Sequence, residues 1–157
     1  MPFRVKIASL EEKPIIHSIL QPYLKELSCF PDEHADFQDV AGVYLYPYLD
    51  AYWQEKERFP YLLYDDGILA GFALVRNDGD HWEVAEYYVK SEFRRRGLAE
   101  ICASDIFSRH PGKWRIGFNK HNKASLALWK KLAGRLSAGE ITEGKADSSH
   151  DCIQFYV

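Results

Sequence analysis

The chain lacks long apolar runs, paired cysteines and the common metal-binding motifs. No apolar stretch in its 157 residues approaches the roughly 20 residues that a membrane-spanning helix needs, so we expect no membrane partner. The three cysteines, Cys29, Cys102 and Cys152, match no C-x-x-C spacing, and H-E-x-x-H does not occur, so we expect no metal. An odd and sparse set of cysteines fits a reducing cytoplasm, which is the location that we expect.

Two familiar nucleotide-binding motifs and a surplus of positive charge are also missing. Neither G-x-x-x-x-G-K-[ST] nor G-x-G-x-x-G after a strand occurs, which argues against a P-loop or a dinucleotide-binding fold. The net charge of −3 argues against bulk nucleic-acid binding, so we expect no nucleic-acid partner. The length suits a single domain, residues 1–157, that buries roughly 70% of its unfolded surface.

The hydrophobic pattern predicts strands and helices in the order of a mixed α/β domain. Ser9 and Glu12 form a capping-box pattern that opens a first helix, and residues 21–58 read as one or two short helices plus a long loop. Two turns with the Asp-Gly signal predict an antiparallel meander, and a helical crossover then leads to a parallel strand. The predicted strands cover residues 3–7, 61–64, 68–75, 81–89, 114–118 and 152–157. We therefore expect a mainly antiparallel central sheet with flanking helices.

A basic turn follows the predicted strand that ends at Val89. It reads Arg94-Arg95-Arg96-Gly97-Leu98-Ala99 and opens a helical pattern. The first turn of a helix has unpaired N–H groups and partial positive charge, and Gly97 lets a ligand approach the backbone closely. Arginine side chains add fork-shaped donors that suit phosphate oxygens. The turn therefore predicts a phosphate or pyrophosphate site, although a solvated basic surface turn is the simpler alternative.

The order of elements and two motifs resemble the GCN5-related N-acetyltransferases, over roughly residues 60–134. That family carries an R/Q-x-x-G-x-G/A turn between its fourth strand and third helix, and Arg94, Gly97 and Ala99 match it. Its next helix opens with Asn, as here at Asn122, and carries a Tyr one face further along, where this chain has Trp129. The resemblance implies a GNAT-like acyl-CoA N-acyltransferase fold.

The resemblance also implies acetyl-CoA as the acyl donor, with no metal. The pyrophosphate would lie against the turn, and pantetheine amides would pair with the exposed edge of the preceding strand. A backbone N–H near Val89 would stabilise the oxyanion that forms when an amine attacks the thioester. The implied cofactor-binding residues are Tyr88, Val89, Arg94, Arg95, Arg96, Gly97, Leu98, Ala99, Asn122 and Trp129.

Two strand carboxylates are candidates for the catalytic base, Glu83 and Glu86. An ammonium group with a pKa of about 10.4 must lose a proton before it can attack, and a carboxylate is the family's usual acceptor for it. Glu83 matches the position used in the histone-acetylating branch, whereas Glu86 lies nearer the expected thioester. Strand alternation puts them on opposite faces unless a bulge intervenes, and we favour Glu86. Either residue could instead be an ordinary solvated strand glutamate.

Trp129 is the main departure from the family pattern. The family's Tyr protonates the leaving thiolate, and an indole N–H is not an acid that can do so. Either the enzyme needs no general acid, because solvent can reprotonate a thiol with a pKa near 8.5, or another residue such as Tyr87 or Tyr88 serves. Packing over the sulfur end of the cofactor is the role that we favour for Trp129.

Aromatic residues are dense in residues 44–64, the region that walls the acceptor pocket in the family. Tyr46, Tyr52 or Trp53 would form an apolar wall, and Asp50 with Glu55 would attract a cationic amine. Core packing is the alternative reading of this stretch. The expected partner is a small-molecule or peptide amine of unspecified identity, and the sequence leaves room for a homodimer.

These observations predict an N-acetyltransferase that moves an acetyl group from acetyl-CoA to a primary amine in a direct, ternary-complex reaction. The alternative is a CoA-binding sensor or regulatory module without transferase activity, which the Trp129 replacement favours.

Overall fold

The computed structural model describes residues 2–31, 33 and 38–157. The strands are β1 (Phe3–Ile7), β2 (Arg58–Asp65), β3 (Ile68–Asn77), β4 (Trp82–Val89), β5 (Lys113–Asn119), β6 (Thr142–Lys145) and β7 (His150–Tyr156). The α-helices are α1 (Lys13–Leu27), α2 (Ala51–Gln54), α3 (Leu98–Arg109) and α4 (Lys123–Leu136). Two short 3-10 turns, Leu10–Glu12 and Ser91–Phe93, precede α1 and α3.

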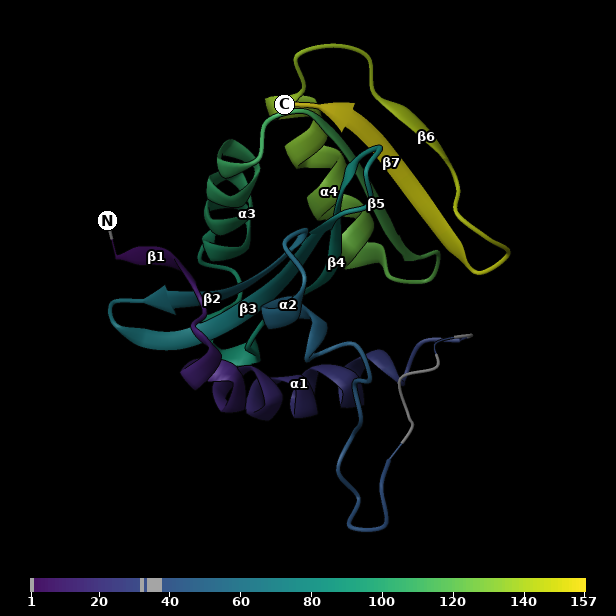
Figure 1. Cartoon of the computed structure of the whole chain (residues 1–157). Helices are drawn as coiled ribbons and strands as arrows, with labels where there is room; N and C mark the ends of the chain where they lie inside the picture. Colours follow the sequence, from purple (N-terminus) through teal and green to yellow (C-terminus); the bar gives the residue numbers. More distant parts are fainter. Residues whose placement is uncertain (1, 32, 34–37) are drawn as a thin grey trace.

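The strands form one sheet in the order β1-β2-β3-β4-β5-β7-β6 (Figure 1). Every neighbouring pair is antiparallel except β4 and β5, which are parallel. The predicted mixed fold with a mainly antiparallel sheet is therefore confirmed. The predicted hairpin at Asp65–Gly67 is also present, since Asp66 and Gly67 have φ values of 51° and 81°.

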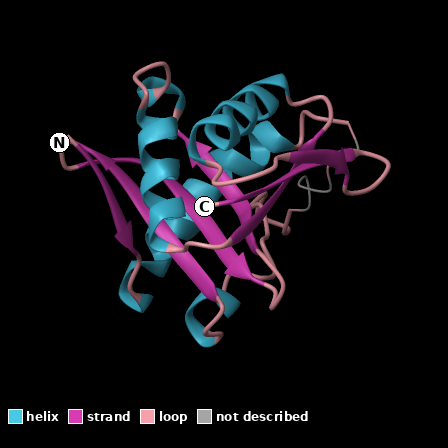
Figure 2. Cartoon of the chain, turned by 90° about the horizontal axis from the view of Figure 1, so that it is seen from above, coloured by secondary structure: helices cyan, strands magenta, loops and turns pink. Residues whose placement is uncertain are grey.

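Helices cover both faces of the sheet and create two hydrophobic cores (Figures 1 and 2). One face packs against α3 and α4, with Phe107 and Trp114 fully buried between them. The other face packs against α1 and α2, with Ile16 and Phe72 at its centre. None of the helices in the described ranges combines the length and the apolar character needed to cross a membrane.

The first helix is longer than the proline content of its sequence predicts. The predicted capping box is present, because Glu12 accepts hydrogen bonds from the Ser9 main-chain N–H at 3.0 Å and from the Ser9 hydroxyl at 3.1 Å, but it opens the 3-10 turn Leu10–Glu12, and α1 begins directly after that turn. Pro22 does not end the helix, which continues to Leu27. Proline has no N–H, so the helix loses one backbone hydrogen bond at Pro22. Burial of the apolar stripe that includes Ile19 and Leu24 offsets this loss.

Two irregularities in β4 determine how its two edges and faces are used. The pairing with β3 shifts between Leu74 and Val75, which pair with Glu86 and Val84, so Ala85 is a one-residue bulge. On the other edge, β4 is paired with β5 only where Trp82 meets Trp114. The two parallel strands therefore diverge, and the second half of β4 has an open edge.

Candidate active site

The turn between β4 and α3 presents main-chain N–H groups at the start of a helix. Arg95 and Gly97 have φ values of 64° and 80°, so the chain twice adopts the left-handed conformation just before α3. Among the residues that the structure describes, no hydrogen-bond acceptor contacts the N–H groups of residues 95–99. Leu98, 1% exposed, anchors the turn in the core. Unpaired N–H groups backed by a helix dipole form an anion-binding concavity, which we call the amide cup (residues 95–99).

A cavity of about 350 Å³ opens beside the amide cup. Arg94, Arg95 and Lys131 bring positive charge to its wall, whereas Phe93 and Leu128 supply apolar surface. This lining suits a ligand that carries phosphate at one end and apolar groups at the other.

The three arginines of the turn have different surroundings. Arg94 donates from Nε to the Val89 carbonyl at 2.9 Å and from Nη2 to Glu26 on α1 at 2.8 Å. Arg96 donates to Asp65 at the end of β2, at 3.2 Å. Arg95 is exposed and lines the cavity. The structure thus places Arg94 and Arg95 at the cavity, with Arg94 also attached to β4 and α1, and attaches Arg96 to β2.

The open edge of β4 begins next to the amide cup. Lys90 donates its main-chain N–H to Ala70 on β3 at 2.8 Å, and the Tyr88 carbonyl lies so close to Gly71 that a Cβ there would be 2.1 Å away. Main-chain groups alternate between the two edges of a strand, so those of Val89 face the gap that separates β4 from β5. The Val89 carbonyl is the group that Arg94 occupies.

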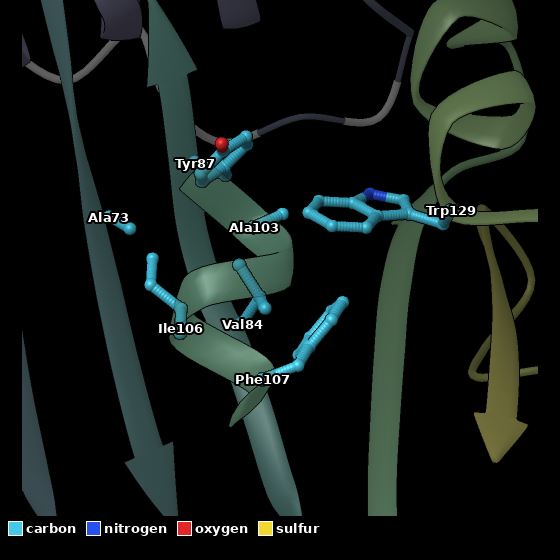
Figure 3. A pocket seen from close by; sticks show the side chains of 7 residues that line it. All are labelled: Ala73, Val84, Tyr87, Ala103, Ile106, Phe107 and Trp129. Atoms are coloured by element: carbon cyan, nitrogen blue, oxygen red, sulfur yellow. The ribbon is translucent and has the colours of Figure 1, made fainter. Parts of the chain in front are cut away.

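Asn122 and Trp129 lie at the start and in the middle of α4. The Asn122 side chain caps the helix, because its Oδ1 accepts the Ser125 N–H at 3.1 Å. Trp129, 4% exposed, packs against Tyr87 and Phe107, with ring centroids 5.4 and 6.3 Å away. Figure 3 shows its indole beside an apolar gap that has no room for a water molecule. The Tyr87 hydroxyl donates to the Ala99 carbonyl at 2.6 Å and so is already engaged at the amide cup.

Glu86 lies on the α1 face of the sheet, where two tyrosines bind its carboxylate. The Tyr23 hydroxyl donates to Oε1 at 2.6 Å, and the Tyr46 hydroxyl donates to Oε2 at 3.2 Å. Burial raises the pKa of Glu86 to about 7, although both tyrosine hydrogen bonds act in the opposite direction. A carboxylate with a pKa near neutrality is well suited to accept a proton from an amine.

Glu83 lies on the same face because of the bulge at Ala85. Val84 packs into the core under α3 and α4, so its neighbour Glu83 points to the opposite face, as Glu86 does. Glu83 accepts hydrogen bonds from Arg76 Nε at 2.7 Å and makes a 2.9 Å hydrogen bond with His81 Nε2. The bulge that would let both carboxylates share a face is thus present, but Glu83 already has two strong partners.

The predicted acceptor-wall residues lie in three different surroundings. Tyr46 contacts Glu86 directly. Asp50 forms an ion pair with Lys13, and Trp53 Nε1 donates to the Ala8 carbonyl at 3.0 Å, so both make contacts near the start of α1. Tyr52 is 3% exposed, and its hydroxyl has no partner among the described residues.

Tyr23 is a site residue that the sequence analysis missed. It follows Ile16, Ile19 and Leu20 on the buried stripe of α1, at spacings of three and four residues. A hydroxyl on an otherwise apolar stripe is the signal that would have indicated it, since a buried hydroxyl needs a polar partner.

Among the described residues, one group of side chains has the spacing of a metal site. Ligand atoms of Asp78, His81 and Glu83 lie within 4.8 Å of one another. These side chains already bind each other, and Glu83 also binds Arg76, so the charges are satisfied without a cation.

Comparisons with known proteins agree with this fold. The sequence profile of the acetyltransferase (GNAT) family matches residues 24–134. The fold is similar to the PaiA N-acetyltransferase from Thermoplasma acidophilum, solved with coenzyme A, with a TM-score of 0.67, 14% identity and 100% of both chains covered. It is also similar to YncA from Salmonella typhimurium, solved with its cofactor acetyl-CoA, with a TM-score of 0.65, 15% identity and coverage of 100% and 94%.

A third similar structure is the ribosomal-protein-S18-alanine N-acetyltransferase from Escherichia coli. Its TM-score is 0.60 at 16% identity, and the match covers 97% of this chain and 90% of that one. A search of curated proteins finds no significant match.

Proposed function

The chain belongs to the GNAT acetyltransferase family, and we propose that it transfers the acetyl group of acetyl-CoA to a primary amine in a direct, ternary-complex reaction. One observation carries this proposal. A partly buried carboxylate, Glu86, lies on the strand whose open edge leads into the amide cup, so the proposed base and the proposed anion site share one structural element.

The cofactor side uses mainly backbone groups. In the proposed complex, the N–H groups of residues 95–99 bind the pyrophosphate, and Arg95 adds a cationic donor. Pantetheine lies along the open edge of β4, where the Val89 main chain pairs with it and Arg94 releases the Val89 carbonyl. Asn122 caps the start of α4, and Trp129, packed against Tyr87, supports the sulfur end of the cofactor.

The chemistry proceeds by attack of a neutral amine on the thioester carbonyl. Glu86 accepts a proton from the ammonium group, and the neutral amine then attacks to form the C–N bond. The attacking nitrogen gives up its second proton to solvent, and collapse of the tetrahedral intermediate breaks the C–S bond and releases CoA thiolate. The Val89 N–H stabilises the oxyanion. Solvent reprotonates the thiolate, because a thiol pKa near 8.5 needs no dedicated acid.

The acceptor approaches from the α1 face, beside Glu86 and Tyr46. A small-molecule or peptide amine fits this description equally. We place the reaction in a reducing cytoplasm, since the three cysteines are unpaired.

Thermal denaturation with and without acetyl-CoA tests the cofactor site. A ligand at a hundredfold excess over Kd stabilises a protein by about 2.7 kcal/mol, which raises the Tm of a domain of this size by about 5–10 °C. We expect Arg95→Glu to remove most of that shift. Arg4→Glu, the same charge change at an exposed position on β1, should leave it intact. Equal acetyl-CoA-induced Tm shifts in both variants would contradict the assignment of the amide cup as the pyrophosphate site.

An acceptor screen that reads out free thiol tests the transfer itself. Release of CoA with at least one amine supports the transferase. Tight acetyl-CoA binding without release across a broad panel would instead favour a CoA-binding sensor, the alternative that Trp129 suggests.

A further inference from the structure

Glu86 is held by two tyrosines that come from distant parts of the chain. Tyr23 lies on α1 and Tyr46 lies in the segment before α2, yet each hydroxyl donates to a different oxygen of the same carboxylate, at 2.6 and 3.2 Å. A carboxylate oxygen has two lone pairs, so each oxygen that binds a tyrosine can still accept a proton from an acceptor amine.

The two tyrosines are fixed to different degrees. The Tyr23 ring packs edge-on against Phe72 at 5.4 Å between centroids and against Tyr88 at 5.5 Å, so its hydroxyl cannot turn away without repacking the core. Tyr46 packs against Tyr48, which is 62% exposed, and its hydrogen bond to Glu86 is longer. Tyr23 should therefore have the larger effect on Glu86.

Other groups around Glu86 also affect its pKa. Burial and the charge of Glu33 favour the neutral carboxyl, whereas Arg76 on β3 favours the carboxylate. The hydroxyl of Tyr52 is unpartnered among the described residues, and the negative charge of Glu86 contributes to raising its pKa, as it does for Tyr23 and Tyr46. The hydroxyl groups of Tyr23 and Tyr46 are the direct donors to the carboxylate.

We propose that Tyr23 and Tyr46 are positioning residues that hold Glu86 as an ionised carboxylate facing the acceptor. This inference rests on the proposed role of Glu86 as the base. Both hydroxyl groups donate to the charged form, so removing either one makes protonation of Glu86 easier. In such a variant, Glu86 is ionised, and so able to accept a proton from the amine, only at a higher pH than in the wild type.

The pH dependence of kcat/KM, measured for Tyr23→Phe, Tyr46→Phe and the wild type, tests the inference. Loss of a hydrogen bond to a charged group shifts the acidic midpoint upward by about one pH unit, more for Tyr23→Phe than for Tyr46→Phe. The rate should recover at high pH, where Glu86 is ionised in every variant. Tyr44→Phe is the control from the same segment, because Tyr44 contacts α1 through its main chain, to Gln21; its midpoint should stay at the wild-type value.

A purely structural role for the tyrosines gives a different result. It lowers the rate at every pH and leaves the midpoint in place, which would overturn the inference. Titration of the Glu86 carboxyl by carbon-13 NMR in the folded variants measures the same midpoint without activity. A Glu86 titration midpoint that is the same in the variants and the wild type would also overturn the inference.

Glu86→Gln separates this inference from the proposed function. If the acidic limb disappears in Glu86→Gln but stays fixed in both tyrosine variants, Glu86 is the base and the positioning role is wrong. If the acidic limb persists in Glu86→Gln, the base assignment fails, and the positioning role fails with it.

Discussion

The proposed cofactor side and the proposed acceptor side of this site are built in opposite ways. The amide cup is one contiguous stretch, residues 95–99, and its binding groups are main-chain N–H groups. The acceptor side joins Tyr23, Tyr46 and Glu86 from three separate segments, and its binding groups are side chains. A backbone site depends on which residues tolerate an unusual φ, whereas a side-chain site depends on the whole fold.

The two sides also differ in how they handle charge. The cup is exposed and positive, so it can receive an anion from water at little cost. Glu86 is partly buried, and burial raises its pKa to about 7 while hydrogen bonds from two tyrosines act in the opposite direction. The variants below should therefore affect binding on one side and chemistry on the other.

Glu86→Gln should have the largest effect. Loss of a general base lowers the rate by about 10²–10⁴-fold at neutral pH, while the acetyl-CoA thermal shift stays, because the cup is untouched. Glu83→Gln is the matched change on the same face, and we expect a loss of less than about tenfold, since Arg76 and His81 already bind Glu83. A larger loss in Glu83→Gln than in Glu86→Gln, measured as CoA release, would exchange their roles.

The same substitution should also change how stability depends on pH. The folded-state pKa of Glu86 is about 7, above its ordinary value of 4.5, so its protonated form stabilises the fold below about pH 4.5 and that stability is lost as pH rises through 7. Glu86→Gln avoids this loss and should be more stable than the wild type at pH 8, by up to about 3 kcal/mol. Denaturation midpoints of both proteins at pH 5 and pH 8 measure the difference. A difference that is equal at the two pH values would contradict the raised pKa.

Gly97→Ala tests the backbone half of the comparison. Gly97 has a φ of 80°, so an alanine there should cost about 1 kcal/mol of stability and weaken acetyl-CoA binding by about tenfold, the equivalent of one phosphate hydrogen bond. Gly67→Ala carries the same strain, with a φ of 81° at the β2–β3 turn, and should lower stability without changing the affinity. Equal affinities in the two variants would show that the cup tolerates the distortion.

Trp129→Tyr should have the smallest effect. It restores the phenol that the family pattern has at this position, but solvent already reprotonates the thiolate, so kcat should change by less than about threefold. The measurement is kcat and the basic limb of its pH profile. A hundredfold rise in kcat would mean that the missing acid limits the wild type.

Much of the local structure on the proposed cofactor side could be predicted from the sequence. The Arg94–Ala99 turn is local, and its glycine, its position after a strand and the helical pattern that follows are all visible in the chain. The Asp-Gly hairpins and the Asn122 cap are local too, and the structure has each of them. The directions of the arginine side chains were not predictable, because Glu26 and Asp65, which bind Arg94 and Arg96, are distant in sequence.

The acceptor side shows where sequence reasoning ends. The bulge at Ala85 has no local signal. The apolar stripe of α1 indicates only that the Tyr23 hydroxyl needs a polar partner, and that this partner is Glu86 depends on how α1 packs against β4. Pro22 predicted a break in the first helix, but burial of its apolar stripe keeps the helix continuous. Strand β6 was not predicted, because all of its residues are exposed and no hydrophobic periodicity indicates a strand.

The bulge in β4 has a consequence for how such chains vary. Because Leu74 and Val75 already pair with Glu86 and Val84, removing the single residue Ala85 would make the strand regular and leave Glu83 and Glu86 on the same face. The extra residue can therefore be lost or kept without exchanging side chains between the two hydrophobic layers, so the spacing of the two glutamates along the chain can vary while the face that they share stays the same.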